Sequence, residues 1–302
     1  MVNLSIAAIT WHNDGLHVRV YFQKDDGFVY EAAWDKGIGW NSGDKKLFQA
    51  KIGTPLAAIV FVPTEPKIRV YYLDTSYMLQ EYVFSSGWGW KKGATLPSPD
   101  LTPITSLAAV TWRQPPNQQI RVYYQKQNST IQEVVYSSGW SVGFSFNDHA
   151  YPGTSLSAAI IKENVINYNP SFRVYWQEHK LSLNEYAWSG SWSNRDLHFS
   201  PTPSSGISAV AWLDGSGHAH IRIYLGNAAG NVQQLAYDDP NGWVIPPFIP
   251  VNVTVASFKA PVGAIAWQDE GIEVRIYVQS TSSNNITELV HSKGWSFRIL
   301  NF

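Results

Sequence analysis

The string QIRVYYQ at residues 119–125 decides the fold of this chain, because close variants of it recur along the whole sequence. The variants are HVRVYFQ at 17–23, KIRVYYL at 67–73, SFRVYWQ at 171–177, HIRIYLG at 220–226 and EVRIYVQ at 273–279. Their arginines stand 50, 52, 52, 49 and 53 residues apart, so six copies of about 50 residues fill the chain. In these strings apolar and polar side chains alternate with a period of two, which indicates a β-strand.

Each copy carries further residues at nearly fixed distances from its arginine. A strand of small residues lies upstream, as AAITW, AAIVF, AAVTW, AAIIK, AVAW or AIAW. A glutamate follows the arginine by twelve residues, except that the fifth copy has glutamine there and the sixth has its glutamate at thirteen. An aromatic or histidine ring stands three residues beyond this position, and a tryptophan comes 19 to 21 residues after the arginine.

This repeat predicts the architecture. A repeat of about 50 residues with roughly four short strands is typical of a β-propeller blade, and six copies lie within the usual range of four to eight blades. No segment shows a sustained helical stripe of apolar residues. We therefore expect one all-β domain, a six-bladed β-propeller with about four antiparallel strands per blade. The expected blades are 1–53, 54–104, 105–154, 155–206, 207–260 and 261–302.

Composition excludes several classes of protein. Lys and Arg number 22 and Asp and Glu 23, so the net charge is −1, which argues against a nucleic-acid partner. The absence of cysteine rules out disulfides, thiolate nucleophiles and iron–sulfur clusters. His218 and His220 share a strand face but have no evident third ligand, so we expect no metal and no cofactor.

The same composition bears on location. No segment approaches the ~20 apolar residues of a membrane span, so we expect no membrane insertion. The first residues lack a basic region followed by a long apolar run, so no classical signal peptide is expected. A soluble protein follows, located in the cytoplasm or reaching the exterior or the cell surface by a nonclassical route.

The recurring polar residues predict a site between blades. An unbulged hairpin would place each arginine directly opposite its glutamate, on one face of the sheet. The ring three residues beyond the glutamate lies on the other face, which meets the arginine face of the neighbouring blade. Guanidinium donors, carboxylate acceptors, an indole N–H and an apolar ring together suit a monosaccharide. Several weak sites on one rigid ring would bind a multivalent glycan with avidity.

With IRVYYQ, the glutamate, the ring and the closing Gly-Trp, the six repeats resemble the fungal fucose-binding lectins of the Aleuria aurantia lectin family. The resemblance covers essentially the whole chain. It implies calcium-independent binding of L-fucose between adjacent blades, fucosylated oligosaccharides and glycoproteins as partners, and commonly a homodimer. It also implies that Arg and Glu bind the sugar hydroxyls, that a Trp of the next blade donates a further bond, and that an aromatic ring covers the apolar face.

Carried onto this chain, each fucose site joins an arginine and a glutamate of one blade to two rings of the next. The five full sites are Arg19, Glu31, Phe84 and Trp90; Arg69, Glu81, Tyr136 and Trp140; Arg121, Glu133, Trp188 and Trp192; Arg173, Glu185, Tyr237 and Trp243; and Arg275, Glu288, Trp34 and Trp40. The remaining site departs from the pattern and is expected to be weak or empty, with Arg222, Gln234, His291 and Trp295.

Simpler interpretations compete with this one. A single Arg–Glu pair is most often a surface salt bridge, but six arginines in register with five glutamates argue against that explanation. The aromatics upstream of the arginines are assigned mostly to the core, and the tyrosines two residues after them either support the site or merely pack. A sialidase-type glycosidase would need one unique catalytic set, and a WD or kelch scaffold would show Gly-His, Trp-Asp or paired-glycine repeats. Neither pattern recurs, so no catalysis is expected.

Overall fold

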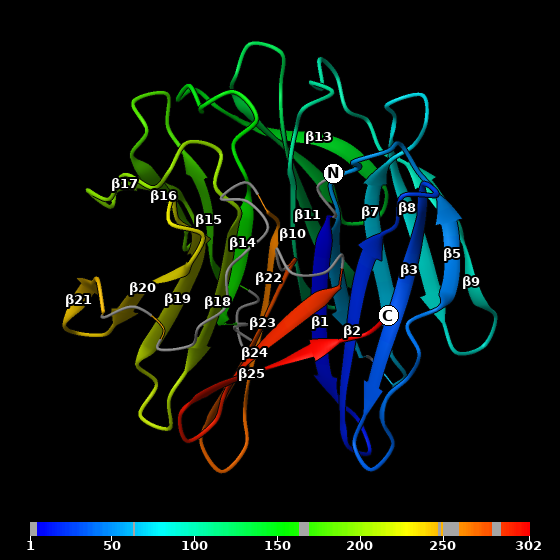
Figure 1. The fold of residues 1–302 in the computed structure, drawn as a ribbon. Coiled ribbons are helices and arrows are strands. Elements are labelled where there is room, and N and C mark those ends of the chain that lie inside the picture. The colour runs from blue at the N-terminus through cyan, green and yellow to red at the C-terminus, as the bar shows by residue number, and fades with distance from the viewer. Residues whose placement is uncertain (1–4, 63, 163–168, 247–248, 250–259, 280–284) are drawn as a thin grey trace.

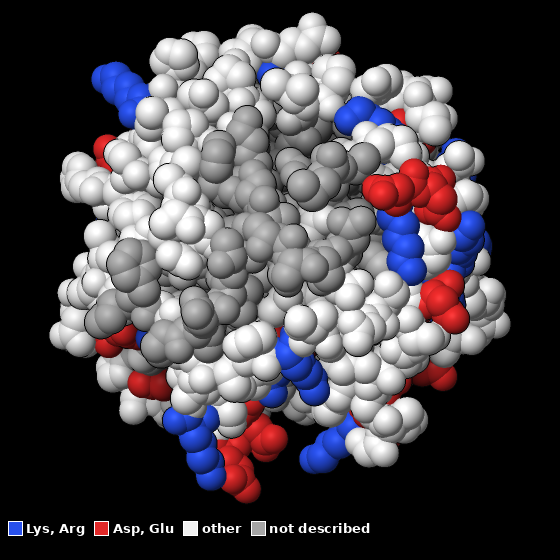
Figure 2. Space-filling view, in the orientation of Figure 1, with Lys and Arg blue, Asp and Glu red and all other residues white. Residues whose placement is uncertain are grey.

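The computed structural model describes residues 5–62, 64–162, 169–246, 249, 260–279 and 285–302. Within that part, the chain forms six antiparallel sheets set around a ring (Figure 1). The expected six-bladed β-propeller is confirmed. No helix among the described residues is long and apolar enough to cross a membrane. Around the rim of the face shown in Figure 2, Lys and Arg side chains lie beside Asp and Glu side chains.

The strands follow one another through the blades in sequence order. The first three blades contain β1 (Ile6–His12), β2 (Leu16–Gln23), β3 (Phe28–Asp35), β4 (Gly39–Trp40) and β5 (Lys45–Gln49); β6 (Ala57–Phe61), β7 (Lys67–Leu73), β8 (Leu79–Ser85) and β9 (Gly89–Thr95); and β10 (Leu107–Gln114), β11 (Asn117–Gln125), β12 (Ile131–Tyr136) and β13 (Trp140–Phe146). The last three contain β14 (Ser157–Lys162), β15 (Ser171–Gln177), β16 (Leu183–Trp188) and β17 (Trp192–Asp196); β18 (Ile207–Leu213), β19 (Ala219–Gly226), β20 (Val232–Asp238) and β21 (Gly242–Val244); and β22 (Val262–Gln268), β23 (Ile272–Gln279), β24 (Ile286–His291) and β25 (Trp295–Leu300).

The first blade interrupts its outer strand. Both β4 and β5 pair with β3, so together they occupy the place that a single fourth strand takes in the other blades. Between them, the side-chain oxygen of Asn41 accepts bonds from the backbone N–H groups of Ala33 at 2.9 Å and Gly43 at 3.1 Å. The amide side chain thus satisfies backbone donors where the ladder is broken.

The central hairpin of each blade has a register two residues away from the expected one. In the third blade, Tyr123 pairs with Glu133, and Arg121 pairs with Val135. The same shift occurs in the other blades. The prediction that arginine lies directly opposite glutamate is therefore wrong, although both lie on one face as diagonal neighbours. The reason is that the tyrosine two residues after the arginine takes the position opposite the glutamate.

The hydrophobic core is divided among the junctions between blades. Each of six buried clusters combines side chains from two adjacent blades. In one cluster, Val110 and Trp112 of the third blade pack with Phe172, Val174 and Trp176 of the fourth. Both faces of β2, β7, β11, β15, β19 and β23 are therefore buried, which explains why these strands are so rich in apolar and aromatic residues.

The ring closes by side-chain packing between the first and last blades. No strand is exchanged among the described residues, because β1 to β5 and β22 to β25 form separate sheets. Val18 and Val20 of the first blade pack with Ile265 and Tyr277 of the last. Phe302, beyond β25, stacks on Phe22 and meets the edge of the Trp40 ring, at centroid distances of 5.7 and 5.5 Å.

Candidate functional site

We number each junction by the blade that contributes its arginine. In five junctions a buried glutamate accepts a hydrogen bond from the tyrosine that faces it across the hairpin. The distances from tyrosine Oη to carboxylate are 3.2 Å for Tyr21 and Glu31, 3.4 Å for Tyr71 and Glu81, 3.0 Å for Tyr123 and Glu133, 2.9 Å for Tyr175 and Glu185, and 2.9 Å for Tyr277 and Glu288. Burial and the adjacent carboxylate raise the pKa of these tyrosines well above the ordinary value, so each hydroxyl stays protonated and donates. The tyrosines, which sequence alone could not assign, position the carboxylates.

The arginine reaches the same carboxylate in four junctions. The Nε-to-carboxylate distances are 3.2 Å for Arg69 and Glu81, 3.6 Å for Arg121 and Glu133, 3.8 Å for Arg173 and Glu185, and 3.9 Å for Arg275 and Glu288. A buried carboxylate needs such partners, because an unpaired charge in the interior is costly. Each of these junctions therefore presents a guanidinium and a carboxylate side by side.

The aromatics upstream of the arginines have a role that the sequence interpretation missed. The guanidinium carbon of Arg121 lies 4.7 Å from the ring centre of Trp112, and equivalent contacts of 4.8 to 5.6 Å occur in four other blades. Stacking on an aromatic face orients a planar guanidinium. In the fourth blade Lys162 ends the corresponding strand instead. The recurrence of Trp or Phe at this position was the sequence signal for it.

The glutamates differ in their contacts with the outer strand. Glu31 is bound by Lys45 at 2.8 Å, and Glu288 by Arg298. Glu81 and Glu133 instead turn toward strand irregularities, where the backbone N–H groups of residues 94 and 144 donate to them at 3.4 and 3.2 Å. A Cβ atom added to Gly93 or Gly143 would lie 2.5 Å from the carboxylate, so only glycine leaves room for it.

The rings come from the following blade, as the sequence predicted by strand parity. In the second junction, the rings of Tyr71 and Trp140 meet edge to face at 5.9 Å, and Tyr136 lies 5.2 Å from Trp140. Equivalent contacts join Tyr21 to Trp90, Tyr175 to Trp243, Tyr224 to Trp295 and Tyr277 to Trp40. In the third junction, Tyr123, Trp188 and Trp192 belong to one apolar cluster. The first, fourth and sixth also bring Phe84, Tyr237 and Trp34 into the clusters between the same blades.

Three of the closing tryptophans have an unpaired donor. The indole Nε1 atoms of Trp40, Trp90 and Trp243 are buried and have no hydrogen-bond partner within the described part of the chain. Leaving a buried donor unsatisfied costs roughly 1–3 kcal/mol. Because these atoms have almost no accessible surface, a ligand could supply an acceptor only if neighbouring side chains moved aside.

The second junction forms a small cavity of about 240 Å³. Arg69 and Glu81 line it from one blade, and Gln118, Ile120 and Tyr136 from the next. Pockets for drug-sized ligands span about 300–1,000 Å³, so this one suits a single small ring. Its wall combines charged donors and acceptors with an aromatic face, which matches a polyhydroxylated ring with one apolar side.

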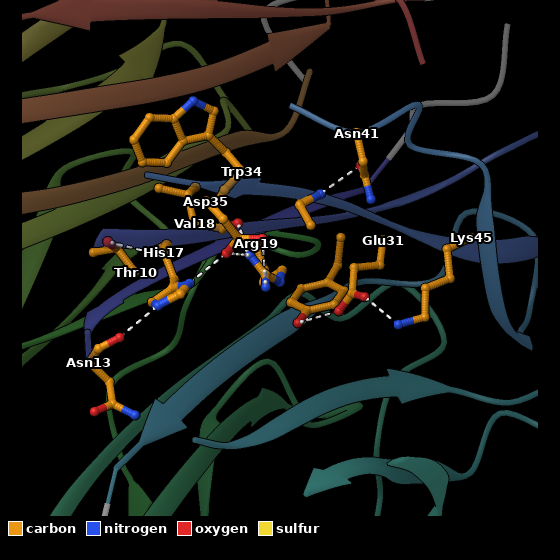
Figure 3. A network of polar contacts seen from close by, with 12 residues as sticks. Thr10, Asn13, His17, Val18, Arg19, Glu31, Trp34, Asp35, Asn41 and Lys45 are labelled. Atoms are coloured by element: carbon orange, nitrogen blue, oxygen red, sulfur yellow. Dashed lines mark hydrogen bonds and ion pairs between the residues drawn. The ribbon is translucent and has the colours of Figure 1, made fainter. Parts of the chain in front are cut away.

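The first junction departs from this arrangement (Figure 3). Arg19 turns away from Glu31 and instead donates to Asp35, with Nη1 at 3.0 Å and Nη2 at 3.4 Å. His17 holds the same carboxylate at 2.5 Å. The expected Arg19 and Glu31 are thus on one face, but within the described residues they form no ion pair.

The fifth junction departs further. Arg222 binds Asp238 at 2.9 Å, and His220 contacts that carboxylate at 2.5 Å. Gln234 stands opposite Tyr224, and no acceptor for the Tyr224 hydroxyl is found among the described residues. The cavity here measures about 750 Å³ and is also lined by His291 and Trp295.

The histidines considered as metal ligands share the carboxylate of Asp214, and His220 also contacts Asp238. His218 Nδ1 and His220 Nε2 lie 3.3 and 3.4 Å from Asp214 Oδ2. No group of three metal-ligating side chains occurs in the residues that the structure describes.

Comparison with known proteins places this chain in a family. The model of the fungal fucose-specific lectin family matches residues 1–301. The chain belongs to this family. The fucose-specific lectin of Aspergillus oryzae is 31% identical over 91% of this chain and 86% of its own length. The fucose-specific lectin of Aleuria aurantia is 30% identical over 96% of this chain and 93% of its own length.

Solved structures of the family share the fold. A crystal structure of the Aleuria aurantia lectin, described as a six-bladed β-propeller, superposes on this family member with a TM-score of 0.83 and 27% identity, covering 99% of this chain and 96% of that one. A variant of the same lectin in complex with α-methyl-L-fucoside gives a TM-score of 0.83 at 26% identity, with the same coverage.

Proposed function

We propose that this protein is a multivalent lectin that binds L-fucose in fucosylated glycans, at sites between adjacent blades and without calcium. The observation that carries the proposal is the repeated set of arginine, tyrosine-held glutamate and following-blade rings. Membership of a fucose-specific lectin family supports fucose as the sugar. Fucosylated oligosaccharides and glycoproteins are the partners that this chemistry recognises.

The arrangement favours binding over catalysis. A glycosidase needs two carboxylates with different roles around one bond. Here one carboxylate is repeated in five blades, and it is held by a tyrosine each time. The curated relatives are named as fucose-specific lectins. The protein is a carbohydrate-binding protein and not an enzyme.

Isothermal titration with methyl α-L-fucoside tests the proposal. We expect saturable binding at several sites per chain, no heat with galactose or mannose, and unchanged binding in EDTA. Charge-assisted bonds to hydroxyls are specific, but each site holds a single sugar ring, so each should bind weakly and glycans with several fucoses more tightly. No heat with the fucoside would leave the propeller intact and remove the function.

Fucoside affinity should fall on acidification, and the fall should begin at a higher pH than it would if the glutamates had their ordinary pKa. Burial raises the pKa of Glu81, Glu133 and Glu185 above the ordinary 4.5, against the opposing effect of the adjacent arginines. Protonation removes the charged acceptor, so binding is complete well above this raised pKa and is lost as the pH falls through it. Titrations from pH 8 to pH 4 measure the effect.

Thermal unfolding across the same pH series is the control for that experiment. A raised carboxylate pKa means that the folded state binds the proton more tightly than the unfolded state. Protonating these three glutamates therefore does not itself destabilise the fold, and the unfolding temperatures show whether the protein is folded at each pH where binding is lost. Affinity that stays constant down to pH 4.5 would contradict a role for these carboxylates.

A further inference from the structure

The six arginines fall into two groups according to the contacts of their Nη2 atoms. In the first and fifth junctions, Nη2 donates to an aspartate sixteen residues further along the chain, at 3.4 Å from Arg19 to Asp35 and 3.3 Å from Arg222 to Asp238. In the other four junctions, the hydrogen bonds of the guanidinium among the described residues are donated by Nη1, and none by Nη2. Nε of those four arginines points to the glutamate instead.

The repeats supply an internal comparison for this difference. The residue at the position of Asp35 and Asp238 is serine in each of the other four blades, namely Ser85, Ser137, Ser189 and Ser292. Two residues before the arginine, only the first and fifth blades carry histidine, as His17 and His220. The aspartate and the histidine therefore occur together or not at all.

The histidine holds the aspartate in place against the arginine. His17 Nε2 lies 2.8 Å from the carbonyl oxygen of Asn13, and its ring stacks on Trp11 at 5.0 Å. His220 stacks on Trp212 in the same way, at 5.5 Å. Burial opposes ionisation of Asp35, but the bonds from His17 and Arg19 outweigh it and hold the pKa of its carboxyl below the ordinary value. The equivalent bonds from His220 and Arg222 outweigh burial at Asp238 and lower the pKa of its carboxyl. Both carboxylates are therefore charged at neutral pH.

A charged aspartate on the guanidinium competes with a sugar. The donors that a fucose hydroxyl would use are already engaged by an anion from the protein. The bound arginine is also drawn away from its glutamate, so the paired donor and acceptor no longer face one ligand. In the sixth junction, Glu273 engages only Nη1 of Arg275, at 2.9 Å.

We propose that Asp35 with His17, and Asp238 with His220, act as latches that weaken fucose binding at the first and fifth junctions. The inference rests on the proposed function and deepens it, because it names the residues that make fucose affinity differ from one junction to another. It changes the sequence prediction for the first junction, where the full set of Arg19, Glu31, Phe84 and Trp90 suggested an intact site. Four stronger sites per chain remain, those of Arg69, Arg121, Arg173 and Arg275.

The test is Asp35→Ser, which installs the residue that the other blades carry. Titration of this variant with methyl α-L-fucoside should show the first site tightening by about tenfold, since a charge-assisted competitor is removed. The number of stronger sites should rise from about four to about five per chain. The gain should vanish in Asp35→Ser with Arg19→Ala.

A reciprocal pair of substitutions gives a matched control. Lys67→His with Ser85→Asp transplants the latch into the second junction and should weaken that site by about tenfold, leaving about three stronger sites. Thermal unfolding identifies any variant that fails to fold. The first test strengthens a weak site at the first junction, and the second weakens a strong site at the second junction. Because they change different junctions, one remains informative if the other variant is unstable.

The outcomes separate the latch from the function itself. If the unmodified protein binds no fucoside, the proposed function fails. If it binds and Asp35→Ser leaves the first site unchanged or weakens it, the latch is wrong, and Asp35 is then neutral or itself a ligand for the sugar.

Discussion

Arg121→Ala should abolish fucoside binding at one site and leave the other sites unchanged. The guanidinium of Arg121 lies beside Glu133 and stacks on Trp112. We expect its remaining donors to bind the sugar at the third junction. Two lost bonds to a charged group, at about 1.5–3 kcal/mol each, would weaken that site by at least about 100-fold. Isothermal titration should show one fewer stronger site per chain.

The same substitution should also cost stability. Glu133 is only 6% exposed, and it would lose the cation 3.6 Å away. Removing one partner of a buried ion pair costs about 3–5 kcal/mol. Because Tyr123 and the backbone N–H of Phe144 still donate to the carboxylate, we expect a smaller loss of about 1–3 kcal/mol in the free energy of unfolding.

A double variant separates the two effects. Adding Glu133→Gln to Arg121→Ala removes the orphaned charge and keeps a polar side chain opposite Tyr123. Denaturant unfolding should then recover most of the lost stability, whereas the titration should still lack the third site. If Arg121→Ala unfolds the propeller and binding returns with stability in the double variant, the arginine is structural and the assignment of the site is wrong.

The architecture could be predicted from the sequence because one pattern is repeated six times. A single strand such as 119–125 is ambiguous, but six copies at nearly constant spacing leave few alternatives. Strand parity alone was also enough to place the rings of one blade against the arginine face of the preceding blade. These conclusions depend only on periodicity, which the sequence contains directly.

The register could not be predicted from periodicity. Shifting a hairpin by two residues keeps every side chain on its face, so parity cannot distinguish the two registers. The structure places Tyr123 opposite Glu133 because this brings the tyrosine hydroxyl to the carboxylate. The nearly constant spacing of Arg, Tyr and Glu contained this information, but the register follows from it only once the buried hydrogen bond between Tyr and Glu is known.

The latch was missed for a different reason. Its residues are not part of the pattern that the copies share, because His17 with Asp35 and His220 with Asp238 occur in two copies and have no counterpart in the other four. Both pairs are separated by 18 residues, so the signal was present. Ring closure through Phe302 was equally out of reach, because it depends on contacts between the two ends of the chain.

The fifth junction should become a functional site when two residues are restored to the pattern of the other blades. Gln234→Glu places a carboxylate opposite Tyr224, whose hydroxyl has no acceptor among the described residues. Asp238→Ser removes the anion that now binds Arg222 at 2.9 Å. We expect the double variant to bind methyl α-L-fucoside at this junction about 10- to 100-fold more tightly than the unmodified protein does.

Titration of the single and double variants measures the contribution of each change. Gln234→Glu alone should give a smaller gain, because Arg222 stays on Asp238 and the new carboxylate lacks its cation. Asp238→Ser alone should free the arginine without supplying the charged acceptor. If the double variant folds normally and gains no site, then His291 in place of an aromatic ring is the decisive defect, and the glutamate is less important for binding than the other five junctions suggest. Adding His291→Tyr would decide this, since Tyr136 and Tyr237 occupy the equivalent position in two full sites.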